Sequence, residues 1–147
     1  MRIEFRLGWG KSRSSLSRLF RLPGTSAAIE DYLRRIGRFC PCGAAAAAGA
    51  RGTGERLWLL DPRAKPASSE EIARRLSDVL ASGAPCLQIA VGGPDGYSES
   101  EIARLRPDFR WGLGPMTLPH ELAAVVAAEQ VYRAWTILRR APYHFAH

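Results

Sequence analysis

The sequence predicts an α/β fold, a mostly parallel sheet with flanking helices, in a single domain over residues 1–147. Short apolar or alternating runs, typical of strands, are separated by stretches in which apolar residues recur at helical spacing. Turns rich in glycine and proline follow several of the apolar runs. With 147 residues, of which 46% are hydrophobic, the chain is long enough to bury a core of this kind.

The first third of the chain contains one strand and a helical region that is broken once. Residues 2–7 alternate strictly between polar and apolar side chains, which predicts a half-buried strand. Residues 14–36 have helical spacing on both sides of Pro23-Gly24. The stretch 40–56 is rich in glycine and alanine and has no clear period, so we expect a loop or poorly ordered segment there.

The middle of the chain predicts a strand, a helix and a second strand. Residues 57–60 form a short apolar run that ends at an Asp-Pro pair, as a buried strand would. Ser68 followed three positions later by Glu71 is typical of a helix start, and Gly83 is typical of its end. Residues 86–91 are again continuously apolar apart from one glutamine, which predicts a second buried strand.

The last part of the chain predicts two helices with a strand between them. Ser98 and Glu101 form a capping-box pattern that opens a short helix, and residues 110–113 are consistent with a strand. The final helix, over about residues 121–139, has apolar side chains on more than one face. A helix of that kind is buried twice, so we expect a second copy of the chain to cover it, as in a homodimer.

The charge of the chain is unevenly distributed. The net charge is +7; residues 1–65 hold 13 basic and 5 acidic side chains, whereas residues 66–147 hold 8 and 9. A basic half indicates an anionic partner, with nucleic acid the first candidate, although a GC-rich genome also favours arginine. The basic residues expected to attract RNA include Arg13, Arg18, Arg34, Arg35 and Arg38.

Targeting and metal-binding signals are weak. Residues 1–6 lack the apolar core of a signal peptide and residues 44–48 are too short to cross a bilayer, so we expect a cytoplasmic protein without a membrane partner. Cys40 and Cys42 have one residue between them, fewer than the roughly two to four of zinc pairs, and Cys86 stands alone. We therefore expect reduced thiols and no metal.

Three predicted strands end in loops of special composition, at residues 60–62, 92–96 and 112–119. In parallel sheets such loops meet at the carboxyl ends of the strands, where ligands bind. Two glycine- and proline-rich loops side by side would form a slot lined by main-chain groups, suited to a flat heterocycle such as adenine. The alternative is a tight turn that merely needs glycine, and the phosphate-binding motif G-x-x-x-x-G-K-[ST] is absent from the sequence.

Four motifs in this order resemble the RlmH family, SPOUT-class methyltransferases of large-subunit ribosomal RNA. They are GGPDG at 92–96, TLPH at 117–120, EQVYRAW at 129–135 and PYH at 142–144, and the resemblance covers residues 57–147. It implies a C-terminal trefoil knot, S-adenosyl-L-methionine as cofactor, and methylation of N3 of a pseudouridine in 23S rRNA by a homodimer acting on rRNA or the ribosome. Residues 2–5 and 32–35 are similar to the first strand and helix of the family, with a longer segment between them.

The resemblance also implies the site residues. The cofactor would lie against Leu60, Gly93, Leu113, Gly114, Pro115, Met116, Thr117 and Leu118. The chemistry would fall to Arg133, Tyr143 and His144. From the residues alone, Arg133 could instead pair with Glu129, the tail could be a frayed end, and His120 is better explained by packing at a helix start.

Three functions therefore compete. The first is a 23S rRNA methyltransferase. The second is a catalytically silent RNA- or ribosome-binding relative with a reduced N-terminal half, and the third is a small-molecule α/β enzyme that uses a nucleotide.

Overall fold

The computed structural model describes residues 1–11, 13–46 and 51–146, and its strands form one parallel sheet in the order β2-β1-β4-β3-β5. The strands are β1 (Arg2–Gly8), β2 (Cys42–Ala46), β3 (Arg56–Leu60), β4 (Cys86–Gly92) and β5 (Phe109–Trp111). The helices are α1 (Leu16–Leu19), α2 (Thr25–Ile36), α3 (Ser69–Ala81), α4 (Glu99–Leu105), α5 (His120–Leu138) and the short 3-10 helix η1 (His144–Ala146). No helix among the described residues is long and apolar enough to span a membrane.

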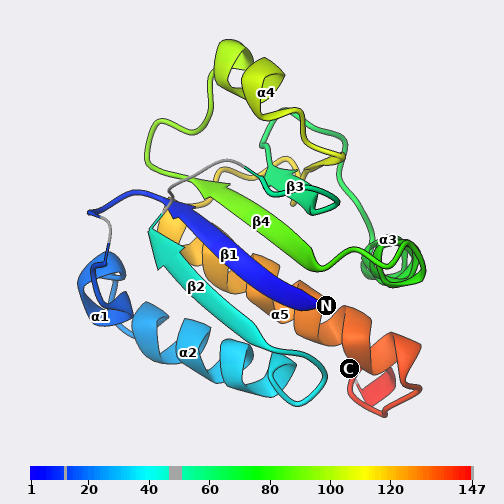
Figure 1. Ribbon diagram of the computed structural model, residues 1–147. Helices are drawn as coiled ribbons and strands as arrows, with labels where there is room; N and C mark the ends of the chain where they lie inside the picture. The colour runs from blue at the N-terminus through cyan, green and yellow to red at the C-terminus, as the bar shows by residue number, and fades with distance from the viewer. Residues whose placement is uncertain (12, 47–50, 147) are drawn as a thin grey trace.

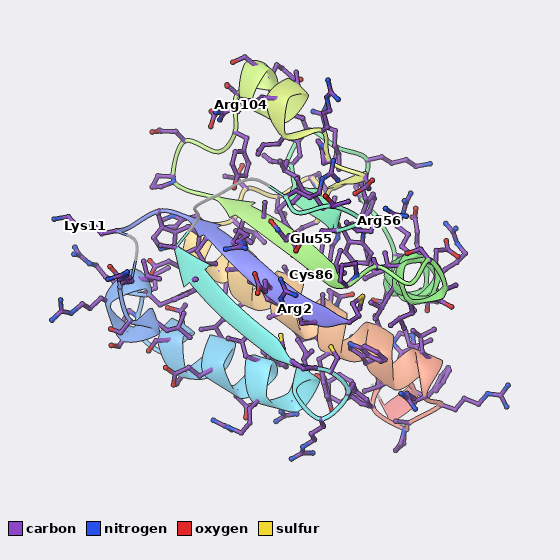
Figure 2. The ribbon with its side chains drawn as sticks, in the orientation of Figure 1. Arg2, Lys11, Glu55, Arg56, Cys86 and Arg104 are labelled. Atoms are coloured by element: carbon purple, nitrogen blue, oxygen red, sulfur yellow. The ribbon has the colours of Figure 1, made fainter. Side chains whose placement is uncertain are left out.

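The two faces of the sheet are covered unequally. Helices α2, α5 and α3 pack on one face, where the inward side chains of β1 and β4 form the main core (Figure 1). On the other face, Ile102 of α4 packs over Leu57, Leu59 and Ala90. On this second face, none of the described helices covers β1 and β2. Instead, Arg2 pairs with Glu4 and Glu55, and Arg6 pairs with Glu4 (Figure 2).

Local sequence rules predicted most of these elements correctly. Ser68 accepts a hydrogen bond from the main-chain N–H of Glu71 at 3.1 Å, and Ser98 and Glu101 form both bonds of a capping box. The alternation of β1 places Ile3, Phe5 and Leu7 in the core. Trp58, Trp111 and Trp135 are also buried.

Two predictions about strands need correction. The expected loop over 40–56 is wrong for Cys42–Ala46, which forms β2 and pairs with β1 from Ile3↔Cys42 to Leu7↔Ala46. Small residues with low strand propensity adopt this conformation because β1 offers a free edge, an effect that periodicity does not reveal. Strand β5 begins at Phe109 and ends at Trp111, before the expected end at 113, because Gly112 makes only an isolated bridge to Pro66.

Much of the apolar surface of helix α5 is buried by other elements of the same chain. It packs on the sheet and is flanked by α2 and α3, which explains the complete burial of its small residues. These are Ala124, Ala127, Ala128, Val131 and Ala134. Leu122 nevertheless stays 38% exposed, and Val125 and Val126 are half-buried. One apolar strip of the helix is therefore still open to a partner.

Candidate functional site

A cavity of about 600 Å³ lies at the carboxyl edge of the sheet, between the loops that follow β3, β4 and β5 and the start of α5. This is the place where parallel sheets bind ligands. Seven of the eight predicted cofactor residues line it: Leu60, Gly93, Leu113, Gly114, Met116, Thr117 and Leu118. Pro115 is not among the lining residues. His120 and Ala123 close the cavity from α5, and Asp61 lines it beside Leu60.

The glycines after β4 allow close contacts within the chain itself. A Cβ at Gly92 would lie 2.9 Å from the Cα of Gly96, which has a φ of +67°. A Cβ at Gly93 would lie 3.0 Å from the carbonyl oxygen of Gly8 and 3.5 Å from the Cβ of Trp9. Small residues at this position therefore let the exits of β4 and β1 lie against each other. A side chain at position 93 would therefore first disturb the contact between the exits of β4 and β1.

The loop after β5 depends on Gly112 in the same way. A Cβ at Gly112 would lie 2.3 Å from the carbonyl oxygen of Ala64 and 2.9 Å from that of Lys65. The main chain of Ala67 also donates a hydrogen bond to the carbonyl of Gly112 at 3.2 Å. The segment after β3 thus passes directly over the exit of β5, next to Pro62, Trp111 and Leu113, which line the cavity.

Asp61 and Arg63 together join the loop after β3 to β5 and to the loop after β4. It is 2% exposed and accepts hydrogen bonds from the main-chain N–H of Arg63 at 3.0 Å, from Arg63 Nε at 3.1 Å and from Arg110 Nε at 2.9 Å. Arg63 also donates to the carbonyl of Tyr97 at 3.1 Å and pairs with Glu99 at 3.0 Å. Burial by itself raises the pKa of Asp61, but the bonds from Arg110 and Arg63 outweigh it and lower that pKa below its usual value.

Replacing Asp61 by Asn is expected to lower the free energy of unfolding at pH 7 by about 2–4 kcal/mol, because two arginines lose their carboxylate. The pKa of Asp61 is lowered in the folded protein, so its stabilising effect is present above the unfolded carboxyl pKa of about 4. That effect is lost as the pH falls through the folded pKa. The difference in the free energy of unfolding between wild type and variant should therefore become smaller as the pH falls from about 5 to about 2, as measured in denaturant titrations.

Asp95→Asn is the matched control for this prediction. Asp95 also lines the cavity but is exposed, and no ion pair to it occurs within the described part of the chain. Its removal should change stability by less than about 0.5 kcal/mol. A gap between wild type and Asp61→Asn that stays constant from pH 7 to pH 2 would contradict the assigned role of the carboxylate.

The three predicted catalytic residues come together in a cluster at the end of α5. Arg133 donates to Glu129 Oε1 from Nη2 at 2.7 Å and from Nε at 3.0 Å, so the structural pair considered from sequence is confirmed. The Tyr143 hydroxyl donates to the same oxygen at 3.1 Å. His144 lies between Arg133 Nη1, 3.1 Å from its Nδ1, and Glu70 Oε1, 2.9 Å from its Nε2.

These contacts fix the proton on His144. A guanidinium can only donate, so Nδ1 of His144 accepts and Nε2 carries the hydrogen that is donated to Glu70. The hydrogen bond to Glu129 raises the pKa of Arg133, and burial raises the pKa of Tyr143. Glu70, 74 positions from His144, was missed because no local pattern relates the two. The imidazole can accept a proton at Nδ1 only after Arg133 has turned to another acceptor.

The cluster and the cavity lie at opposite ends of α5. Ala123 lines the cavity, and Arg133 follows ten residues later, which corresponds to about 15 Å along the helix axis. In Figure 1 the arrows of β1, β2 and β4 point toward the start of α5, whereas the C-terminal end of α5 and η1 lie toward the starts of these strands. Within one chain, the predicted catalytic residues therefore do not face the predicted cofactor residues.

The cysteines give no sign of metal chemistry. Cys40, Cys42 and Cys86 are free thiols, and burial raises the pKa of Cys42 to about 12 and that of Cys86 to about 11. Among the residues that the structure describes, no group of three or more His, Cys, Asp or Glu side chains could hold a metal ion.

Comparison with known proteins supports a methyltransferase family. The family model of the "Predicted SPOUT methyltransferase" matches residues 44–144. A protein named ribosomal RNA large subunit methyltransferase H from Thioalkalivibrio sulfidiphilus is 47% identical over 85 residues, 58% of this chain and 53% of that protein. Proteins of the same name are 43% identical over 90 residues in a Psychrobacter species (61% and 54%) and over 91 residues in Pseudomonas aeruginosa (62% and 57%). The chain thus spans about half the length of the curated relatives that it matches.

Proposed function

The chain belongs to the SPOUT methyltransferase family, and from this premise we propose that it methylates N3 of a pseudouridine in 23S rRNA with S-adenosylmethionine as donor. The observation that carries the proposal is the cavity at the carboxyl edge of the sheet, which is built from the part of the chain that matches the family. The names of the relatives support rRNA as the substrate class, and such a substrate would place the reaction in the cytoplasm.

The residues of the cavity fit this cofactor. Its volume of about 600 Å³ lies within the range of roughly 300–1,000 Å³ that is usual for small ligands. Leu60, Leu113 and Leu118 would hold a flat adenine, and the main chain of Gly93 and Gly114 would meet its polar edge. When bound, S-adenosylmethionine supplies a methyl group on a positively charged sulfonium.

The polar cluster supplies the proton chemistry that this reaction needs. N3 of a pseudouridine carries a proton that must leave before or during methyl transfer. A uracil carbonyl would take the place of His144 as acceptor for Arg133, which frees the Nδ1 lone pair to receive that proton. The imidazolium formed in this way is stabilised by Glu70, 2.9 Å from Nε2, while Arg133 faces the negative charge that develops on the base.

A second subunit would bring the cluster to a cavity. Leu122, Val126, Glu129 and Arg133 are spaced by four, three and four residues, so they share one strip of α5. Val126 lies midway between His120 at the cavity and Arg133 in the cluster. A two-fold axis near Val126 would pair the helices antiparallel and place the partner's Arg133 opposite His120.

Exposed apolar side chains at both ends of this strip support the same pairing. Met116, which lines the cavity, is 76% exposed, and Phe145, next to the cluster, is 79% exposed. In an antiparallel homodimer the tail of one subunit would cover the cavity rim of the other. We propose that each active site is completed in this way.

Val126→Glu is expected to produce monomers and to remove methyl transfer, because the two-fold axis would bring two buried charges together. The dissociation constant should rise by about 100-fold or more, which light scattering at micromolar concentration would show. Leu80→Glu, on an exposed apolar position of α3, is the control and should leave the dimer intact. A monomeric wild type, or a dimeric and active Val126→Glu variant, would contradict the pairing.

The proposed function is tested by transfer of a labelled methyl group to ribosomes that lack the modification, together with calorimetry of S-adenosylmethionine binding. Turnover with both components is the expected result. The occupied nitrogens of His144 favour one alternative, a catalytically silent relative that binds RNA. Binding of ribosomes without turnover would support that relative, and a protein that binds neither ribosomes nor the cofactor would exclude both.

A further inference from the structure

Residues 9–11 and 13–22 lie between β1 and α2, and we call them the basic arm. The indole N–H of Trp9 donates to the carbonyl of Leu19 at 2.7 Å, and the Trp9 ring meets Phe20 edge-on with centroids 5.6 Å apart. Leu19 and Phe20 are both buried. The arm is therefore held at its two ends by contacts of its own.

The basic arm is fastened to the rim of the cavity. The Trp9 ring packs edge-on against His120, which lines the cavity, with centroids 4.5 Å apart. Glu121, the next residue of α5, accepts hydrogen bonds from the main-chain N–H groups of Arg21 and of Leu22, the latter at 3.2 Å. The other side of the rim, at Gly93, faces the main chain that leads into Trp9.

The cations of the arm are exposed and have no acidic partner within the described ranges. Lys11, Arg13, Arg18 and Arg21 are exposed, and residues 9–22 contain no Asp or Glu. Figure 2 shows Lys11 extending away from the fold. Arg34 and Arg35, which were also expected to attract RNA, instead pair with Asp31 at 3.0 and 2.8 Å.

We propose that the basic arm binds the phosphate backbone of RNA beside the cavity, an inference that rests on the proposed function. Three of its four cations are arginines, whose planar guanidinium binds a phosphate through two parallel hydrogen bonds. Arg34 and Arg35 are already paired with Asp31, whereas the cations of the arm are available to bind phosphates. The family match begins at residue 44, so the arm lies outside the part of the chain that the family model matches.

The test uses a variant with Lys11→Gln, Arg13→Gln and Arg18→Gln. Arg21 is left in place because its main chain binds Glu121. Filter binding of protein-free 23S rRNA at several salt concentrations is compared between variant and wild type. The slope of log affinity against log salt should fall by about 2 units, and affinity at about 0.1 M salt should fall at least tenfold. Calorimetry should give wild-type binding of S-adenosylmethionine, because the cavity lining is unchanged.

The matched control carries Arg38→Gln, Arg104→Gln and Arg106→Gln, which removes the same charge from exposed positions on α4, just past its end and past the end of α2. Arg38 was also expected from the sequence to attract RNA, so the control compares that expectation with the arm. Its slope should change by less than half as much. If the wild type binds RNA and the arm variant keeps the wild-type salt slope, the proposed role of the arm is wrong. The proposed function is not affected by that result. A wild type that binds neither protein-free rRNA nor ribosomes would overturn both. If the arm variant no longer binds ribosomes but still binds protein-free rRNA, the partner of the arm is an acidic protein surface and not RNA.

Discussion

Deletion of residues 143–147 is expected to lower methyl transfer to ribosomes by about 10²–10⁴-fold, the range that general acid–base catalysis contributes. The deletion removes Tyr143 and His144 and leaves Arg133 paired only with Glu129. The residues that line the cavity lie between positions 60 and 123, and the basic arm consists of residues 9–11 and 13–22. The affinities for S-adenosylmethionine and for RNA should therefore stay within a few-fold of wild type. Removal of groups that act only in the transition state lowers kcat without weakening binding.

His144→Gln separates the chemical role of the tail from its role in covering a cavity. Glutamine can still contact Arg133 and Glu70 but cannot accept a proton, so turnover should fall nearly as far as in the deletion. Single-turnover transfer of labelled methyl measures both variants, with light scattering to verify the dimer. Full turnover in the deletion would show that the catalytic assignment of the tail is wrong. Full turnover in His144→Gln alone would limit the role of the tail to packing.

Gly112→Ala is expected to destabilise the protein by about 3 kcal/mol or more and to weaken S-adenosylmethionine binding at least tenfold. The added Cβ would lie 2.3 Å from the carbonyl oxygen of Ala64. That atom belongs to the main chain, so no side-chain rotation relieves the contact. The segment after β3 must move away from the exit of β5, and Leu60 and Leu113, which line the cavity on either side, move with it. Thermal unfolding and calorimetry measure the two effects.

Gly43→Ala is the control for that substitution. Gly43 lies in β2, and nothing lies within 4 Å of a Cβ built there. Alanine should therefore change stability by less than about 1 kcal/mol. Equal effects at Gly43 and Gly112 would show that backbone freedom, and not the contact with Ala64, determines the need for glycine in this fold.

Local rules account for what the sequence predicted well. The alternation of β1 and the capping residues Ser68 and Ser98 depend on neighbours within a few positions, which a sequence displays directly. The cavity followed from one general property, that exits of parallel strands share an edge. That property brought Leu60, Gly93 and Leu113 together although they lie far apart in sequence.

Contacts between distant segments account for what was missed. Strand β2 depends on the free edge of β1, and Glu70 reaches His144 across 74 positions. The close approach of Gly93 to the carbonyl oxygen of Gly8 also joins distant segments, and no residue pattern indicates it. The separation of the polar cluster from the cavity depends on the direction of α5 across the sheet, which residue patterns do not specify.

The strand order also determines when this sheet can form. The central pair of the sheet joins β1 to β4, with Phe5 opposite Ile89, so its closure brings together segments more than 80 residues apart. Pairings between segments so distant carry a large loop-closure entropy and slow the folding of parallel sheets. During synthesis from the N-terminus, β1 therefore has no central partner until β4 has left the ribosome. The basic arm reaches its place beside the cavity only after α5 has followed.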